Sequence, residues 1–535
     1  MHQKIIISFL FVYTLAITLY AQPEPATATI SSNNIKAQLT SNGLLFFGEE
    51  KGFEFPIGSN THLMKSSGLW IAGYDLQGNL RGAIQKYNED GKRDFVNEEN
   101  WNKIWRITKK EIDDFREDYM TNGLDEAHPA IFGWPAKGND FFFDENGFDM
   151  PEGDEEYAPF VDINENRIYE PDRGEYPNIG IRCVNLPAPT PDEMLWCRYT
   201  DNTEHTESGM LPINLEVHTS YFVFNCVNNQ FLNNTIFVRH WLINKVDGIL
   251  DDAYIGVFSD FDIGCPDDDY MGASNEFRTI YGYNADNDDT SCTGGEGYGQ
   301  GAPAIATTML MGPWTLLNNA VVFINFNRHM PIPYGDGNEG EPFIGQDYYN
   351  YLDGRWKDGS DMPFGGVFYD GNPSSSPNTE LALGNPQGDR RALGSVGPFI
   401  FRGGGRYELV LAYSVYDEPG NSNLGNVNSM YQGISYLRSE FSDCYANCLQ
   451  QTTPVDQVQE EIEVSIYPNP NSGVFNIVHE DSVQAIFIYS SDKKLVQKIV
   501  TDKTAQTQTV TLTSGLYFVK LETEKGVLIE KVVVY

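Results

Sequence analysis

Short runs of β-branched and aromatic residues, separated by glycine and proline, restrict the fold of this chain more than any other feature. The sequence has 50 Gly and 28 Pro, and they interrupt runs such as TIFVRHWLINK, AVVFINFN and YELVLAYSVY. Glycine and proline favour turns and end helices, whereas β-branched and aromatic residues favour strands. The sequence therefore predicts a mainly β fold with few short helices.

Two segments show helical periodicity instead. Thr108 and Glu111 form a capping box at the start of a helix, with Ile112 and Phe115 on one face. In a second segment, apolar side chains recur every three to four residues at Leu424, Val427, Met430, Ile434, Leu437 and Phe441. We expect this second helix to pack its apolar stripe on a sheet.

The length, the charge and the N-terminus limit the class of protein. A chain of 535 residues is too long for one ordinary core. Its net charge of −39 disfavours nucleic acid and anionic membranes as partners. Residues 1–21 have a lysine, then an apolar run and a final small residue, as a signal peptide does. No later apolar run is long enough to span a bilayer, so we expect a soluble exported protein.

Residues 464–535 are expected to form a separate domain. Apolar and polar residues alternate in the runs VFNIV, AIFIYS, TVTLT, LYFVKLE and VLIEKVVVY, with turn signals between them. This pattern predicts a small antiparallel, immunoglobulin-like β-sandwich of about seven strands. A polar linker, 449–463, precedes it. Residues 22–448 are expected to form a β-sandwich-rich body of one or two subdomains.

The motifs of the C-terminal domain resemble those of a known export signal. IYPNPNSGVFNI, IYSSDKKLVQKI, LTSGLYFVKLET and the final KVVV follow one another in order. They closely resemble the type A C-terminal sorting domain of the type IX secretion system of Bacteroidota-like bacteria. The resemblance implies that residues 464–535 engage the type IX machinery after periplasmic transit. It also implies that the protein is then released or fixed to surface lipopolysaccharide.

The body has a resemblance of its own. SGLWIAGYDLQGNL, WPAKGND, APFVDINENRIYEPDRGEYP, SDFDIG and GDRRALGSVGPFIF occur in this order. They resemble a family of large secreted Bacteroidota proteins with the same sorting tail. Members of that family have DxNxDGxYxP where this chain has DINENRIYEP, so Arg167 replaces the glycine. The resemblance implies no particular activity.

Seven cysteines in an oxidising compartment favour disulfide bonds. Proximity along the chain predicts the pairs Cys183–Cys197, Cys265–Cys292 and Cys444–Cys448. Cys226, in the apolar run YFVFNCV, is expected to be a buried free thiol. The sequence has no CxxC pair and no Cys/His cluster with zinc spacing, so we expect the disulfides to be structural.

The stretch VDINENRIYEPDRGEYP, residues 161–177, is a candidate calcium loop. Calcium takes roughly six to eight oxygen ligands from a loop that curls around it. The spacing offers ligands from Asp162, Asn164, Asn166, the Ile168 carbonyl, Glu170, Asp172 and Glu175. Arg167 stands where glycine is usual, and a positive φ disfavours any other residue there. Two interpretations remain open: a variant calcium loop and an ion-free Asx-turn.

A second acidic segment, FSDFDIGCPDDDYMG, spans residues 258–272. Residues two apart on a strand point to the same side, so we expect Asp260 and Asp262 to lie together. Gly264 and Pro266 then turn the chain before Asp267, Asp268 and Asp269. Three interpretations compete: a second calcium site, a solvated loop, and a glycosidase-like acid pair with two carboxyl groups across a cleft.

No nucleophile elbow, HExxH motif, Walker loop or dinucleotide fingerprint occurs in the sequence. The leading hypothesis is an exported, calcium-stabilised binding or adhesion protein without catalysis, with extracellular glycans among its candidate partners. A secreted carbohydrate-active hydrolase that uses paired carboxylates is the first alternative. A structural component of an extracellular layer or filament is the second.

Overall fold

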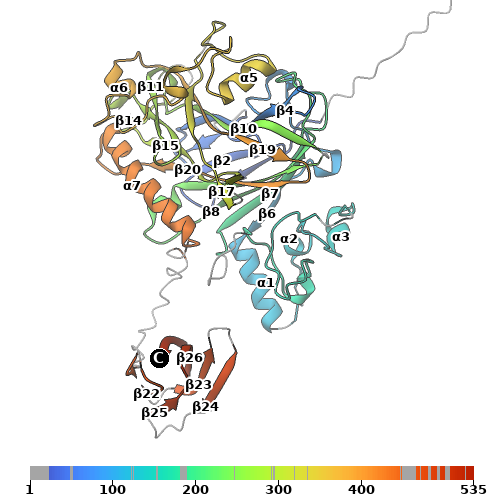
Figure 1. Ribbon diagram of the computed structural model, residues 1–535, viewed down its shortest axis with the longest axis vertical. Helices are drawn as coiled ribbons and strands as arrows, with labels where there is room; N and C mark the ends of the chain where they lie inside the picture. Colours follow the sequence, from blue (N-terminus) through green and yellow to red (C-terminus); the bar gives the residue numbers. More distant parts are fainter. Residues whose placement is uncertain are drawn as a thin grey trace, which may run out of the picture. The chain divides into compact units, whose positions relative to one another are not determined.

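The computed structural model describes residues 23–445, 448 and 465–534, except 49–51, 122, 125, 152, 154, 181–188, 246–247, 291, 293–295, 318–319, 334, 470, 480–482, 491–493, 501–506 and 524–525. Contacts within the chain divide it into two compact units, 1–451 and 452–535. The predicted signal peptide, 1–21, and the predicted linker, 449–463, lie outside the described residues. The described part is mainly β, as predicted (Figure 1).

Two antiparallel sheets form the frame of the first unit. The larger has eight strands in the order β11 (Asp269–Ser274), β12 (Thr279–Asn284), β15 (Ala304–Met311), β20 (Arg406–Tyr416), β9 (Thr235–Asn244), β8 (Leu215–Val223), β7 (Glu193–Thr200) and β6 (Trp105–Thr108). The smaller has five strands in the order β18 (Arg328–Pro331), β19 (Arg390–Arg402), β10 (Ile249–Phe261), β4 (Met64–Tyr74) and β5 (Leu80–Ile84).

The main core lies between these two sheets. Val217 and Leu411 of the larger sheet belong to the same buried cluster as Ile71 and Val257 of the smaller one. Each of the four side chains is fully buried. Burial of such side chains stabilises each by roughly 1.5–3 kcal/mol relative to exposure, which holds the sheets face to face. The first unit is therefore a β-sandwich.

Helices cover the outer faces of the sandwich (Figure 1). Helix α7 (Asn423–Ser442) contacts β12, β15 and β20, and α5 (Gly345–Leu352) contacts β4, β10 and β19. Helix α7 begins where the Ser422 hydroxyl accepts the Gly425 N–H at 3.1 Å. It buries Val427, Met430 and Ile434 of the predicted stripe. Strands β7, β8 and β9 are buried at nearly every position, because side chains such as Trp196 and Phe222 belong to a second buried cluster that includes Phe115 and Trp134.

Helix α1 (Lys109–Thr121) is the second predicted helix, and its capping box is present. The Thr108 N–H donates to the Glu111 carboxylate at 2.8 Å, and the Glu111 N–H donates to the Thr108 hydroxyl at 3.3 Å. The smaller helices are α2 (Pro129–Phe132), α3 (Phe142–Asn146), α4 (Gln230–Asn233), α6 (Glu380–Leu383) and the 3₁₀ turns Glu89–Gly91, Glu99–Trp101, Pro171–Arg173, Pro266–Asp268 and Pro363–Gly365. The remaining strands are β1 (Thr27–Ile30), β2 (Lys36–Thr40), β3 (Phe53–Glu54), β13 (Asp288–Asp289), β14 (Gly299–Gln300), β16 (Trp314–Leu317) and β17 (Ala320–Phe323).

The cysteines confirm one predicted pair and correct the others. Cys265 is bonded to Cys292, as predicted. Cys226 is bonded to Cys448, so the prediction that it is a free thiol is wrong. That prediction placed Cys226 inside a strand, but β8 ends at Val223 and Cys226 lies beyond it.

The predicted pairs Cys183–Cys197 and Cys444–Cys448 are therefore wrong. Cys197 is a free thiol in the middle of β7, where burial raises its pKa to about 12. Cys444 is in a disulfide, and Cys448 is already bonded to Cys226. Cys183 lies outside the described residues.

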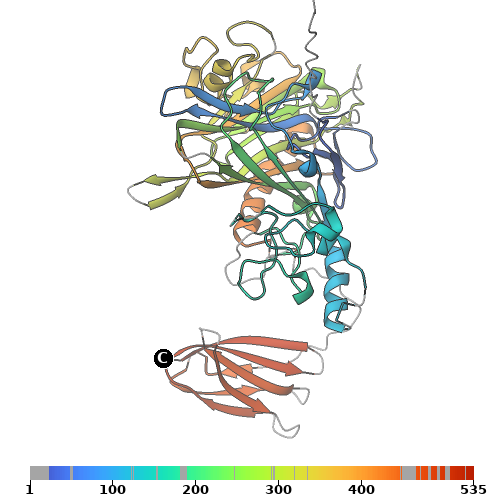
Figure 2. The ribbon, with the colours of Figure 1, turned by 90° about the vertical axis from the view of Figure 1, so that its right-hand side faces the viewer.

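The second unit is a seven-stranded antiparallel sandwich, as predicted (Figure 2). One sheet has the order β21 (Ser465–Tyr467), β22 (Val474–Val478) and β25 (Thr507–Thr511), and the other β24 (Leu495–Val500), β23 (Val483–Ser490), β26 (Gly515–Thr523) and β27 (Gly526–Val534). Its core contains Phe475, Ile477, Ile486, Val519 and Val532. These residues come from the alternating runs, because every second side chain of a strand points to the same face.

Candidate functional site

Four aspartates gather where β10 ends and the chain turns into β11. Asp262, Asp268 and Asp269 belong to the predicted acidic segment, and Asp289 comes from β13. Carboxylate oxygens of Asp268 and Asp289 lie within 4.8 Å of each other. The charges on Asp262, Asp268 and Asp289 all act on the Asp269 carboxyl group. We call these four residues the aspartate cluster.

Backbone donors hold part of the aspartate cluster in place. Asp269 accepts the Ile263 N–H at 3.0 Å, and Asp289 accepts the Cys265 N–H at 3.0 Å. Asp262 Oδ2 lies 3.0 Å from His62 Nε2. The Oδ1 atoms of Asp262, Asp268 and Asp269 are buried and have no hydrogen-bond donor among the described residues. Such atoms are costly to bury unless a ligand, an ion or water contacts them.

The electrostatics of the cluster favour a positive ligand. Burial raises the pKa of Asp289 to about 6, although the Tyr298 and Cys265 N–H groups lower it. The pKa of Asp269 lies well above its ordinary value because the group is buried, and the other three carboxylates act in the same direction. A divalent cation among the carboxylates would reverse this effect, since opposite charge favours the ionised form.

The available donors suit a hard cation. The Cys265 and Cys292 sulfurs lie near Asp267 and Asp268, but they are joined in a disulfide and offer no thiolate. Oxygen ligands of this kind are those of calcium or magnesium rather than zinc. Gly264 has φ of 61°, and a Cβ there would lie 2.1 Å from Asp289 Oδ2. Glycine therefore lets the turn approach the carboxylates.

Asp260 lies apart from the cluster, whereas Asp267 lies at its edge: a carboxylate oxygen of Asp267 is within 4.8 Å of the Cys265 sulfur, and the charge of Asp267 acts on Asp268. Asp260 accepts the Tyr87 hydroxyl at 2.7 Å, and burial followed by the charge of Asp389 raises its pKa to about 7. β10 ends at Phe261, so Asp262 lies beyond the strand and contacts His62 instead of lying beside Asp260. Asp267 is exposed on the turn.

The 161–177 stretch forms a compact polar loop. The Asp162 carboxylate accepts the N–H groups of Asn166 at 3.1 Å and Arg167 at 2.8 Å. The Asn164 side-chain oxygen accepts the Asn166 N–H at 3.0 Å, and that of Asn166 accepts the Ile168 N–H at 2.7 Å. These are the hydrogen bonds of the Asx-turn interpretation. Each oxygen has a second lone pair, so calcium binding at this loop stays a prediction.

Glu175 closes the loop from the opposite side. Its carboxylate is buried and accepts the N–H groups of Ile163 and Glu170, both at 2.9 Å. Arg167 has φ of 62°, so it adopts the left-handed conformation that the sequence position usually reserves for glycine. Asp172 lies in the short 3₁₀ turn Pro171–Arg173 and is exposed.

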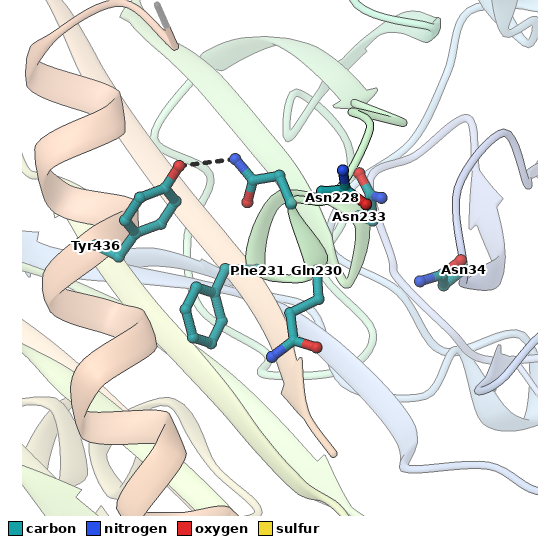
Figure 3. Close-up of a pocket in the computed structure, with 7 residues that line it drawn as sticks. Asn34, Asn228, Gln230, Phe231, Asn233 and Tyr436 are labelled. Carbon is teal, nitrogen blue, oxygen red and sulfur yellow. Dashed lines mark hydrogen bonds between the residues drawn. The ribbon is translucent and has the colours of Figure 1, made fainter. Parts of the chain in front are cut away.

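A recess of about 570 Å³ beside α7 is lined by amides and two aromatic rings (Figure 3). Asn229 caps α4 and donates to the Tyr436 hydroxyl at 2.7 Å. Asn233 exchanges hydrogen bonds with the backbone N–H and carbonyl of Cys226. The recess is lined by Asn34, Asn228, Asn229, Gln230, Phe231, Asn233 and Tyr436. Because Asn229 and Asn233 hold the chain itself together, they act mainly as structural groups.

Sequence reasoning missed Asp289 and His62. The predicted Cys265–Cys292 bond was a usable signal for Asp289, since it draws the segment around 289 towards 265. Nothing in the local sequence of His62 points to Asp262, which is 200 residues away.

Comparisons with known proteins assign the C-terminal unit. Residues 465–535 match the secretion system C-terminal sorting domain. The protein carries a type IX sorting domain. It is therefore secreted or held at the cell surface, in agreement with the sequence resemblance. None of the helices among the described residues is both long and apolar enough to cross a membrane.

The search of curated proteins found no match. Among solved structures, the chain is similar to a polysaccharide lyase with 8% identity and a TM-score of 0.18, over 60% of this chain and 34% of the lyase. The chain thus spans about a third of the lyase. It is also similar to a GalM/aldose epimerase homologue from C. elegans, with 10% identity and a TM-score of 0.20, over 73% of this chain and 99% of the homologue. Similarity at this level carries no argument about function.

Proposed function

We propose that the protein is an exported binding protein whose body is stabilised by calcium in the aspartate cluster. One observation carries the calcium part: carboxylate oxygens of Asp268 and Asp289 lie within 4.8 Å of each other, and Asp268 Oδ1 is buried without a hydrogen-bond donor among the described residues. An ion between Asp268 and Asp289 would contact both carboxylates, and the nearby charges of Asp262 and Asp269 would attract it from a longer distance. The 161–177 loop is a second calcium candidate.

The hydrolase alternative receives less support. It required the carboxylates of the 258–272 segment to face each other across a cleft. Asp260 instead contacts Tyr87, and Asp262 contacts His62 in the aspartate cluster. The recess of Figure 3 is lined by other residues. Binding at the cell exterior is the function that agrees with the sorting domain and a rigid, helix-covered sandwich.

The test is thermal unfolding of the purified full-length secreted protein in chelator and in millimolar calcium. Calcium at a hundredfold excess over its dissociation constant stabilises the folded state by about 2.7 kcal/mol. We expect a higher melting temperature with calcium, and Asp289→Asn to remove most of that increase. Asp267→Asn is the matched control, because Asp267 lies next to Asp268 but is exposed.

Two results would contradict the calcium proposal. The first is an identical melting temperature in chelator and in calcium. The second is a calcium response that survives in Asp268→Asn and in Asp289→Asn, because the ion would then lie elsewhere. Asp162→Ala, measured in the same way, reports separately on the 161–177 loop.

A further inference from the structure

A second recess of about 570 Å³ lies between the ends of β7 and β8 and the segment around residue 155. Its lining combines polar and apolar surface, with four charged side chains: it is made of Pro151, Gly153, Glu155, Tyr157, Arg198, Thr200, Asn202, Asn214, Leu215, Glu216 and Lys245. Pockets of this volume accommodate small organic ligands. The recess shares no residue with the aspartate cluster or with the recess of Figure 3.

Three buried side chains form the floor of this recess and its support. Arg198 Nη2 donates to Glu216 Oε2 at 2.5 Å, and Glu216 Oε1 lies 2.8 Å from His218 Nε2. Arg198 is 8% exposed, Glu216 is 3% exposed and His218 is 1% exposed. Burial would raise the pKa of Glu216, but the hydrogen bonds and charges of His218 and Arg198 hold it well below its ordinary value. Glu216 is therefore an ionised acceptor with a fixed orientation.

Arg198 has donors that the protein does not use. Its Nε and Nη1 are buried and make no hydrogen bond among the described residues. Nη1 has only a longer ion-pair contact, 3.6 Å from Glu98 Oε2. The guanidinium lies 5.0 Å from the centre of the Trp101 ring, which fixes its plane. A buried donor without an acceptor is costly, so these groups point to a ligand or water in the recess.

Tyr157 adds a further polar group at the same place. Its ring stacks on His218 at 5.2 Å and on Trp101 at 5.7 Å, so its position is fixed. Tyr157, Glu155 and Glu216 all line the recess, and burial followed by the charges of the two carboxylates raises the pKa of Tyr157. The phenol therefore remains neutral and can both donate and accept a hydrogen bond.

The balance of charge limits the class of ligand. Arg198 is paired with Glu216, and Lys245 is paired with Glu155, so the two lining cations are already neutralised. An anion would meet two carboxylates, and a metal cation would meet a guanidinium. An apolar ligand would leave the Arg198 donors without acceptors. Hydroxyl groups, which donate to carboxylates and accept from guanidinium, satisfy both kinds of group at once.

We propose that this recess binds a neutral sugar unit, with Arg198 donating to its oxygens and Glu216 accepting from its hydroxyl groups. The inference rests on the proposed binding function and names its ligand class. Amides at Asn202 and Asn214 and the Thr200 side chain line the rest of the recess and supply further hydrogen-bonding groups.

The test is calorimetric titration of the full-length secreted protein with maltose, cellobiose, lactose and chitobiose, and with glucuronate as the charged comparison. We expect one site for at least one neutral disaccharide and no binding of glucuronate. Arg198→Lys should weaken that binding at least tenfold, because lysine lacks the planar set of donors. Tyr157→Phe keeps the stacked ring and should weaken it severalfold. Gln230→Ala, in the other recess, is the control and should bind as the wild type does.

The proposal is overturned if none of the four disaccharides binds, or if only glucuronate binds. It is also overturned if Tyr157→Phe binds the sugar as tightly as the wild type while Gln230→Ala binds it more weakly, because the sugar site would then be the other recess. This comparison does not depend on whether Arg198→Lys folds. The calcium response in thermal unfolding is measured on the same samples. Lost sugar binding with an intact calcium response rejects only the sugar site, and the reverse outcome rejects only the calcium proposal.

Discussion

Acidification should destabilise the body through one buried histidine. His240 lies in β9, is 1% exposed, and has its Nδ1 2.8 Å from the Thr219 hydroxyl oxygen. Burial lowers its pKa to about 3. The pKa in the unfolded chain is about 6.5, so on acidification the unfolded state takes up the proton first and stability falls between these values. About pH 4.5 is two pH units below the unfolded pKa of about 6.5, so the free energy of unfolding is lower there by about 2.7 kcal/mol.

The perturbation that isolates this effect is His240→Gln. The glutamine oxygen can accept the Thr219 hydroxyl proton but does not titrate. We expect the wild type to lose about 2.7 kcal/mol more free energy of unfolding than the variant between about pH 7 and pH 4.5. Carboxyl groups with a raised pKa, such as Asp201 at about 6, have the opposite effect, but they are common to both proteins and cancel.

Urea unfolding followed by tryptophan fluorescence, at both pH values and fixed calcium concentration, measures this difference. A variant that loses the same free energy as the wild type would refute the assignment of the low pKa to His240. If His240→Gln changes the free energy of unfolding at neutral pH, the test still holds, because it compares how much each protein loses between the two pH values.

Three further predictions concern other parts of the chain. The Cys226–Cys448 bond joins residues 222 apart, so Cys226→Ser should destabilise the body by up to about 5 kcal/mol in urea unfolding; mass mapping of non-reduced protein that finds Cys226 free would contradict the bond. Arg167→Gly should leave calcium binding of the 161–177 loop intact or tighten it, because glycine relieves the strain of a φ of 62°; weaker binding, measured by calcium titration, would count against a calcium loop. Deletion of residues 464–535 should leave the protein folded in the periplasm, and immunoblots of culture medium that still find it outside the cell would contradict the export assignment.

Local patterns were sufficient where the structure is itself local. The stripe from Leu424 to Phe441 predicted α7, and the alternation after residue 464 predicted the C-terminal sandwich. Cysteine pairing was not local. Cys226 was assigned to a strand because it follows an apolar run, yet β8 ends three residues earlier and the partner is 222 residues away. Proximity along the chain contains no information about such a contact.

In the acidic segment, too, the sequence pattern did not predict which side chains lie together, although they are only a few residues apart. An unbroken strand would have placed Asp260 beside Asp262, and the acid-pair hypothesis depended on that geometry. β10 instead ends at Phe261, so Asp260 contacts Tyr87 from the strand and Asp262 contacts His62 from the turn beyond it. Composition alone does not predict where the strand ends, because the end follows from how β10 pairs with β4 and β19. Asp268 and Asp269 lie near Asp262 because Gly264 permits a tight turn between them. Asp289 lies in a different strand, β13, and the Cys265–Cys292 bond holds the segment around it next to this turn. A disulfide predicted from the sequence thus shows which distant acidic residues can approach the acidic segment: those near the second cysteine, such as Asp289, are brought towards the residues around the first.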